Sequence, residues 1–105
     1  MRVAIWLSAV VCLAAGRTGA ATCQYAVTAS GLSDFVLNGV ADPTITLFRG
    51  FTYRFQVNSS STHPFWIKSV QGNTSANAYN DGVTGNGTGT GLITFAVPTN
   101  APGTL

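Results

Sequence analysis

The chain contains one histidine, His63, and this residue is the strongest candidate for chemistry in the sequence. An imidazole can bind a metal ion or move a proton near neutral pH. His63 follows the polar cluster 59–62 and precedes alternating apolar positions at Phe65 and Ile67. Because side chains two apart in a strand share one face, this spacing places His63 on the core side at the end of a predicted strand. A histidine that only bonds backbone groups fits the same pattern, so both roles stay open at this point.

The other polar residues do not form a pattern that is typical of an enzyme active site. The acidic residues that could pair with His63 are scattered at Asp34, Asp42 and Asp81, and no Gly-x-Ser-x-Gly pattern is present. The glycine-rich stretch 82–91 lacks the Gly-Lys-Ser/Thr of a phosphate-binding loop, and no helical pattern follows it. We therefore predict that the protein is not an enzyme.

Three asparagines stand in the Asn-x-Ser/Thr pattern that accepts N-linked glycans in eukaryotic secreted proteins. These glycosylation candidates are Asn58, Asn73 and Asn86. In a bacterial host the same triplets would carry no glycan and would only reflect the polar composition of the loops. Their use therefore depends on the compartment and the host.

The first residues have the pattern of a secretory signal peptide. A positive start at Arg2 is followed by the apolar run 3–15 and by small residues up to Ala21. The apolar run is shorter than the roughly 20 residues that a membrane-spanning helix needs. We predict a signal peptide over residues 1–21 and a mature chain over residues 22–105, secreted to the extracellular space or, in a bacterium, to the periplasm. No second apolar run of that length follows, so we predict no membrane span in the mature chain.

The charge of the mature chain excludes one class of partner. The full chain has five basic and three acidic residues, and two of the basic ones, Arg2 and Arg17, belong to the predicted signal peptide. The mature chain is then neutral, with three charges of each sign. Because nucleic-acid binding normally requires a basic surface, we predict no nucleic-acid partner.

Cysteine usage leaves one thiol in the mature chain. Cys12 lies in the predicted signal peptide, so Cys23 is the only cysteine that remains. An unpaired cysteine in a secreted chain indicates a missing partner. That partner is either in another chain or in a segment beyond Leu105.

Alternation of apolar and polar residues predicts strands throughout the mature chain, and no stretch has a sustained helical period. The predicted strands are Cys23–Thr28, Asp34–Leu37, Thr44–Phe48, Phe51–Asn58, Pro64–Ser69 and Leu92–Val97. Turn residues separate them at Ala29–Ser33, Asn38-Gly39 and Arg49-Gly50. We expect the strands on either side of Arg49-Gly50 to form a pair. Short strands at this spacing are typical of an all-β sandwich or barrel.

The segment 69–91 differs from the rest because it is rich in Gly, Asn, Thr and Ser. Its main apolar residues are Tyr79 and Val83. We expect a long ordered loop that is anchored by these two side chains and carries at most one short strand.

The order of these segments resembles the cupredoxins, the plastocyanin-like blue copper domains. The residues that carry the resemblance are Ile45-Thr46-Leu47, Gly50, the stretch FTYRFQVN at 51–58, His63, Phe65-Trp66-Ile67 and the stretch ITFAVPTNAPGTL at 93–105. The resemblance implies a cupredoxin-like Greek-key β-sandwich over residues 22–105. It also implies one bound copper ion, electron transfer and a redox partner protein.

The resemblance assigns only one copper ligand to this chain. The family's first ligand is a histidine at the start of a strand, and it corresponds to His63. The other ligands are a cysteine, a second histidine and usually a methionine from a loop near the C-terminus, which here falls beyond Leu105. The domain is therefore expected to be incomplete at its C-terminus. Pro64 stands where many relatives have asparagine, and Cys23 is far in sequence from the ligand loop, so it is not taken as the copper cysteine.

A type 1 copper site uses two imidazoles and one thiolate in a plane with a weak axial thioether. This set suits both oxidation states, so electron transfer needs little rearrangement. One imidazole does not hold copper tightly, and we expect residues 1–105 alone to bind it weakly or not at all. The alternative function is a metal-free secreted binding or adhesion module, with Trp66 and the loop 69–91 as its surface.

Overall fold

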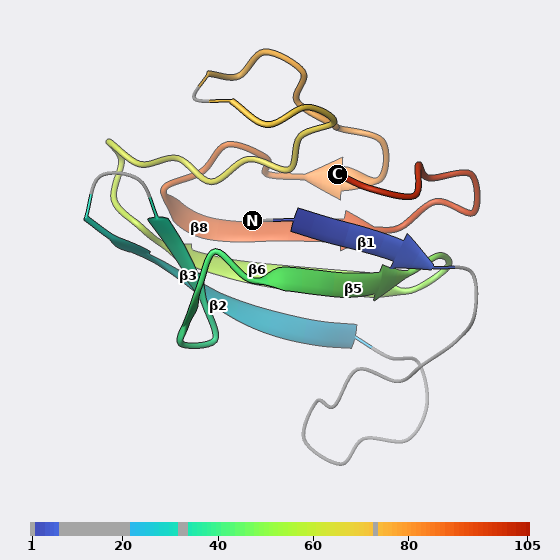
Figure 1. The fold of residues 1–105 in the computed structure, drawn as a ribbon, viewed down its shortest axis with the longest axis horizontal. Helices are drawn as coiled ribbons and strands as arrows, with labels where there is room; N and C mark the ends of the chain where they lie inside the picture. Colours follow the sequence, from blue (N-terminus) through green and yellow to red (C-terminus); the bar gives the residue numbers. More distant parts are fainter. Residues whose placement is uncertain (1, 7–21, 32–33, 73) are drawn as a thin grey trace.

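The computed structural model describes residues 2–6, 22–31, 34–72 and 74–105 (Figure 1). Within these ranges every regular element is a strand, so the predicted all-β class is confirmed. The strands are β1 (Arg2–Trp6), β2 (Thr22–Ser30), β3 (Asp34–Leu37), β4 (Val40–Ala41), β5 (Thr44–Phe48), β6 (Thr52–Asn58), β7 (Val83–Thr84) and β8 (Thr90–Ala96). None of the described residues forms a helix long and apolar enough to cross a bilayer.

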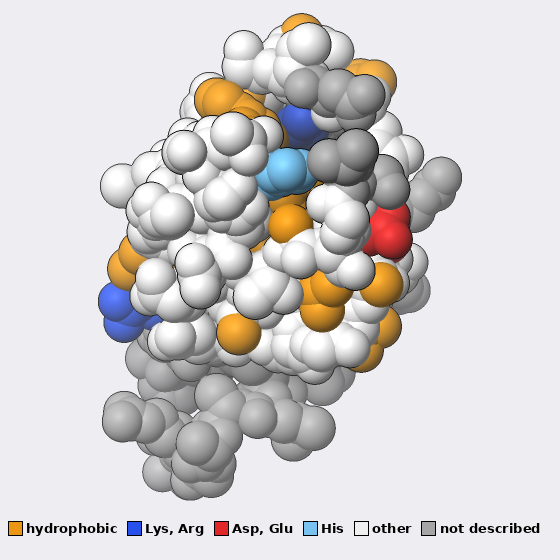
Figure 2. Space-filling view, turned by 90° about the vertical axis from the view of Figure 1, so that its left-hand side faces the viewer, with side chains coloured by type: hydrophobic (Ala, Val, Ile, Leu, Met, Phe, Trp, Pro, Cys, Tyr) orange, Lys and Arg blue, Asp and Glu red, His pale blue; other side chains and the backbone are white. Residues whose placement is uncertain are grey.

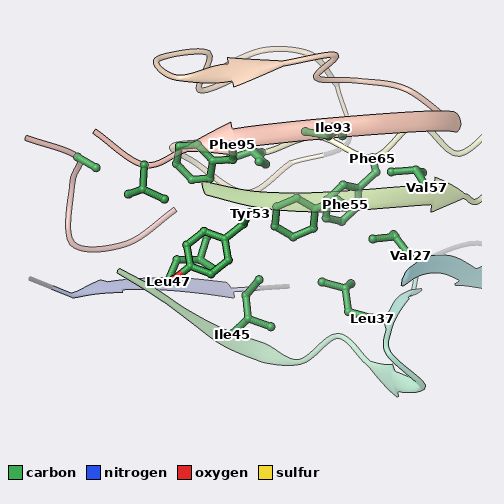
Figure 3. Packing of buried hydrophobic residues seen from close by; sticks show 13 residues of the cluster. Val27, Leu37, Ile45, Leu47, Tyr53, Phe55, Val57, Phe65, Ile93 and Phe95 are labelled. Carbon is green, nitrogen blue, oxygen red and sulfur yellow. The ribbon is translucent and has the colours of Figure 1, made fainter. Parts of the chain in front are cut away.

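The strands form two sheets that face each other, as in a β-sandwich. The larger sheet has six strands in the order β4-β3-β2-β6-β8-β7, and the smaller sheet contains β1 and β5. The larger sheet is mixed, because β2 and β6 run parallel whereas the other neighbours are antiparallel. Figure 3 shows side chains from β5 on one side of the core and side chains from β6 and β8 on the other.

The core is built from the alternating apolar positions of the strands. In β6 the buried residues Tyr53, Phe55 and Val57 alternate with exposed Arg54 and Gln56, as the sequence predicts. The whole buried cluster comprises Val27, Leu37, Ile45, Leu47, Tyr53, Phe55, Val57, Phe65, Ile67, Ile93, Phe95, Val97 and Ala101. Burial of these side chains is the main driving force for the fold.

The predicted pairing of the strands on either side of Arg49-Gly50 is wrong. The turn forms, with Gly50 at a φ of 86°, but it carries the chain from the smaller sheet to the larger one. Instead of pairing with β5, β6 lies between β2 and β8. The two segments remain linked by a side chain, because the Phe48 amide donates to the Tyr53 hydroxyl at 2.9 Å. Period-two alternation indicates which face of a strand is buried, and it carries no information on which backbone lies beside it.

The segment predicted as a strand over Pro64–Ser69 is extended but joins no continuous ladder. It makes two isolated bridges, from Phe65 to Thr88 and from Lys68 to Ala78. The predicted alternation is correct, since Phe65 and Ile67 are each 1% exposed. The segment therefore covers the core without being a strand of either sheet.

The remaining predicted boundaries agree closely with the structure. β3 has the predicted bounds, and Asn38 and Gly39 both have positive φ, as a tight hairpin turn requires. β2 continues to Ser30, so the predicted loop after it begins later than expected. Before β8 begins at Thr90, the described part of the segment 69–91 contains one short strand, β7, and Tyr79 and Val83 pack against the core as predicted.

β1 lies within the predicted signal peptide. It pairs in parallel with β5, from Arg2 opposite Thr44 to Trp6 opposite Phe48. Residues 7–21, which hold the rest of the predicted signal peptide and its cleavage point, lie outside the described residues. The sequence prediction of cleavage after Ala21 therefore stays a prediction.

Candidate functional site around His63

The turn that carries His63 begins directly after β6 and is closed by a buried serine. Ser59 is 6% exposed, and its amide donates to the Gly89 carbonyl at 2.9 Å. Its hydroxyl donates to the His63 carbonyl at 2.6 Å, and the His63 amide donates to the Ser60 carbonyl at 3.1 Å. Ser60 has a φ of 81°, which lets the chain reverse within these few residues. The backbone of His63 is therefore fixed on both sides of its Cα.

The imidazole of His63 is held by two hydroxyl groups. Its Nδ1 atom lies 3.0 Å from Thr62 Oγ1 and 3.3 Å from Ser60 Oγ, and these two hydroxyl oxygens are 2.9 Å apart. If Nδ1 carries the proton and donates it to a hydroxyl, the lone pair of Nε2 is available for a metal ion. Such a contact to the second ring nitrogen is the usual way in which proteins orient a ligating histidine.

His63 lies at one end of the larger sheet and is half-buried. The register pairs the last residue of β6, Asn58, with Thr90 at the start of β8, so the turn leaves the sheet at this end. Figure 2 shows the imidazole in pale blue at the surface, with uncharged polar or backbone atoms to its left, hydrophobic atoms below it and one basic side chain above it. The sequence placed this histidine at the end of a strand, and the structure places it in the turn that precedes the extended segment.

Cys23 and His63 lie at opposite ends of the larger sheet. The register pairs Cys23 with Tyr53, which is five residues before the end of β6 at Asn58. At about 3.3 Å per residue, that separation is roughly 16 Å along the strand. This arrangement agrees with the sequence argument against Cys23 as the copper cysteine.

The described residues do not by themselves fit a type 1 copper centre. Among residues 2–6, 22–31, 34–72 and 74–105 there is no group of three or more His, Cys, Asp or Glu side chains that could hold a metal ion. Such a centre needs a second imidazole and a thiolate beside the first imidazole. Within the described part of the chain, the geometry around His63 therefore supplies one oriented imidazole and no group of further ligands beside it.

The indole of Trp66 is covered by a neighbouring loop. A Cβ atom on Gly87 would lie 2.3 Å from Cζ2 of the indole, and Gly87 has a φ of 83°. A side chain at this position is therefore excluded by contact and by backbone conformation. Trp66 is half-buried as a result, which makes it a weaker anchor for a binding surface than an exposed ring would be.

Asn86 has a structural role that the sequence analysis missed. Its Oδ1 atom accepts a hydrogen bond from the Ile67 amide at 2.8 Å, and its Nδ2 atom donates to the Ile67 and Tyr79 carbonyls at 3.0 Å each. Nδ2 also lies 3.1 Å from Asn80 Oδ1. Nothing in the local sequence separates this asparagine from the other two glycosylation candidates, except that glycines flank it on both sides.

Searches with protein-family profiles, among curated proteins and among solved structures find no match to this chain.

Proposed function

We propose that residues 22–105 are part of a secreted cupredoxin-like domain, and that His63 is one ligand of a copper site whose other ligands lie outside this chain. The function proposed for the complete protein is electron transfer to or from a redox partner protein. The observation that supports this most directly is the oriented imidazole at the end of the larger sheet. The all-β arrangement in two sheets is consistent with a β-sandwich, which is the coarser part of the fold that the resemblance implies.

The role of this chain in such a site is to present one nitrogen in a fixed position. The Ser59 hydroxyl holds the backbone of His63, and the hydroxyls of Ser60 and Thr62 hold Nδ1. Rigid positioning of ligands is what a metal site needs for affinity and for a defined geometry. Because the described residues supply no second imidazole or thiolate, we expect residues 1–105 alone to bind copper weakly.

The coding sequence downstream of Leu105 tests the proposal. We expect a cysteine, a histidine and a methionine close together within one loop. A continuation that lacks these residue types, or a gene that ends at Leu105, would contradict the proposal.

Copper titration of the complete polypeptide is the second test. We expect an intense visible band from thiolate-to-copper charge transfer, and its loss in His63→Ala. Arg54 provides a control, because Arg54→Gln changes an exposed position of β6, the strand that precedes the turn with His63, and should keep the band. A band that survives in His63→Ala would remove this residue from the site.

The second candidate is a metal-free secreted binding or adhesion module. It is favoured by the absence of a metal-binding cluster among the described residues. Its surface would be the loop 69–91, since the Trp66 indole is partly covered and offers less area to a partner. The same copper titration separates the two candidates, because a strong charge-transfer band is incompatible with a metal-free module.

A further inference from the structure

The candidate glycosylation asparagines have very different surroundings in the folded chain. Asn73 lies outside the described residues. Asn58 is the last residue of β6 and is exposed, and no hydrogen bond of its side chain is found among the described residues. Asn86 is half-buried, and both the oxygen and the nitrogen of its side-chain amide make hydrogen bonds. The side-chain nitrogen of Asn58 is therefore available for attachment of a glycan in the folded chain, whereas that of Asn86 is not.

The amide of Asn86 uses both of its hydrogens. Three acceptors surround Nδ2, namely the Ile67 carbonyl, the Tyr79 carbonyl and Asn80 Oδ1, at 3.0, 3.0 and 3.1 Å. A primary amide has two N–H donors, so none is left for another group. If one donor were removed, at least one of these hydrogen bonds would be lost in a partly buried position, although the Ile67 carbonyl also accepts from the Tyr79 amide at 2.8 Å.

The backbone beside Asn86 also leaves no room for a bulky group. A Cβ atom on Gly85 would lie 2.5 Å from the Leu92 carbonyl oxygen, and one on Gly87 would overlap the Trp66 indole. The loop on both sides of Asn86 is therefore packed directly against β8 and against the extended segment 64–69.

N-linked glycosylation changes the atom that Asn86 uses for these contacts. The transferase forms a bond between Nδ2 and C1 of a lipid-linked oligosaccharide diphosphate. The C1–O bond breaks, the lipid diphosphate leaves, and one Nδ2 hydrogen is lost as a proton to a base of the transferase. The product has one N–H and a large sugar on the same nitrogen, so it cannot make the contacts of Asn86 in the folded chain.

We propose that Asn58 is an acceptor for an N-linked glycan, and that Asn86 is a closed site whose amide is required for folding. This inference rests on the proposed secretion, and it takes a lipid-linked oligosaccharide as the donor. The glycan on Asn58 stands at the end of β6, directly before the turn that carries His63. Secreted folded protein therefore carries sugar at one edge of the candidate site and none in the loop 69–91 at Asn86.

The test is expression of the full chain in a eukaryotic secretory cell. The secreted protein is deglycosylated by an amidase in water labelled with oxygen-18, which converts each glycosylated asparagine to a labelled aspartate, and its peptides are analysed by mass spectrometry. We expect Asn58 to be found predominantly as labelled aspartate and Asn86 to remain asparagine. Asn58→Gln should remove the mass of one glycan. Thr88→Ala destroys the pattern at Asn86 while it retains the amide, and it should leave the glycan mass unchanged.

The outcomes separate this inference from the proposed secretion. N-terminal sequencing shows whether the chain has been translocated and processed to begin at Thr22. A secreted, processed chain with Asn86 occupied or with Asn58 bare overturns the glycan assignment alone. An unprocessed chain that stays in the cytosol and carries no glycan overturns both the assignment and the secretion on which it rests.

Discussion

Asn86 contacts Ile67 as a neighbouring strand would, because it accepts from the Ile67 amide at 2.8 Å and donates to the Ile67 carbonyl at 3.0 Å. One side chain thus satisfies both backbone groups of a residue that is 1% exposed. This contact helps the segment 64–69 to cover the core without a continuous ladder, because it gives the Ile67 amide a partner and adds a second donor to the Ile67 carbonyl, which also accepts from the Tyr79 amide at 2.8 Å.

Asn86→Asp should destabilise the fold, because a carboxylate can accept from Ile67 but cannot donate to the Ile67 and Tyr79 carbonyls. We expect a loss of about 2–3 kcal/mol in the free energy of unfolding, measured by denaturant titration. Asn100→Asp, in an exposed turn, is the matched control and should change stability by less than about 0.5 kcal/mol. Equal effects of the two substitutions would contradict the role assigned to Asn86.

Tyr53→Phe tests the link between β5 and β6. The substitution keeps the buried ring but removes the hydroxyl that accepts from the Phe48 amide at 2.9 Å. We expect a loss of about 1–2 kcal/mol in unfolding free energy, because a backbone donor loses its partner. Tyr25→Phe is the control, because the Tyr25 ring stacks on Phe55 and that contact remains in the variant. A Tyr53→Phe variant as stable as the wild type would show that water replaces the hydroxyl.

Alkaline pH should destabilise the protein through its tyrosines, of which Tyr53 is buried and Tyr25 and Tyr79 are partly buried. Burial raises the pKa of Tyr25, Tyr53 and Tyr79 above the ordinary value of 10.0. Because the folded-state pKa lies above the unfolded one, the unfolded state loses its protons first, and stability falls as pH rises above 10. The contribution of these tyrosines to the free energy of unfolding is constant around neutral pH, where their hydroxyls are protonated in both states. The loss of stability is measured as the denaturant midpoint from neutral pH to above pH 10, and ultraviolet titration follows the formation of tyrosinate. A midpoint that does not fall above pH 10 would contradict this prediction.

The sequence predicts burial better than it predicts neighbours. Alternation correctly identified the inward residues of β6 and of the segment 64–69, since burial repeats every second residue whatever lies beside the strand. It failed at the turn around Gly50, where two adjacent strands enter different sheets. It also failed to find the role of Asn86, because the partners of this side chain are 19 and 7 residues away and no local pattern marks them.

His63 illustrates the same limit at the candidate site. Its position before alternating apolar residues indicated the end of the sheet, and the turn lies there. The contacts from Ser60 and Thr62 to Nδ1 depend on how the turn closes around Ser59, which the sequence pattern does not specify. Turn chemistry of this kind is decided by side-chain geometry over a few residues, and several arrangements share the same composition.

Removal of the predicted signal peptide should loosen β5. Among the described residues the only strand paired with β5 is β1, which belongs to that peptide. We expect the amides of residues 44–48 to exchange hydrogen faster in a chain that begins at Thr22 than in the unprocessed chain. The amides of β6 provide the internal control, because this strand lies between β2 and β8 in either form. Equal protection of residues 44–48 in both forms would show that β1 does not contribute to the smaller sheet.

Ser59→Ala should change both the stability of the turn and the position of the imidazole. The substitution removes the hydroxyl that donates to the His63 carbonyl at 2.6 Å, in a residue that is 6% exposed. We expect a loss of about 1 kcal/mol in unfolding free energy. We also expect a shift of the His63 ring resonances, because the ring is held to the same turn through Thr62. Ser61→Ala, at an exposed position two residues away, should change neither quantity. If Ser59→Ala lowers stability and leaves the ring resonances unchanged, the hydroxyls of Ser60 and Thr62 orient the imidazole without help from Ser59.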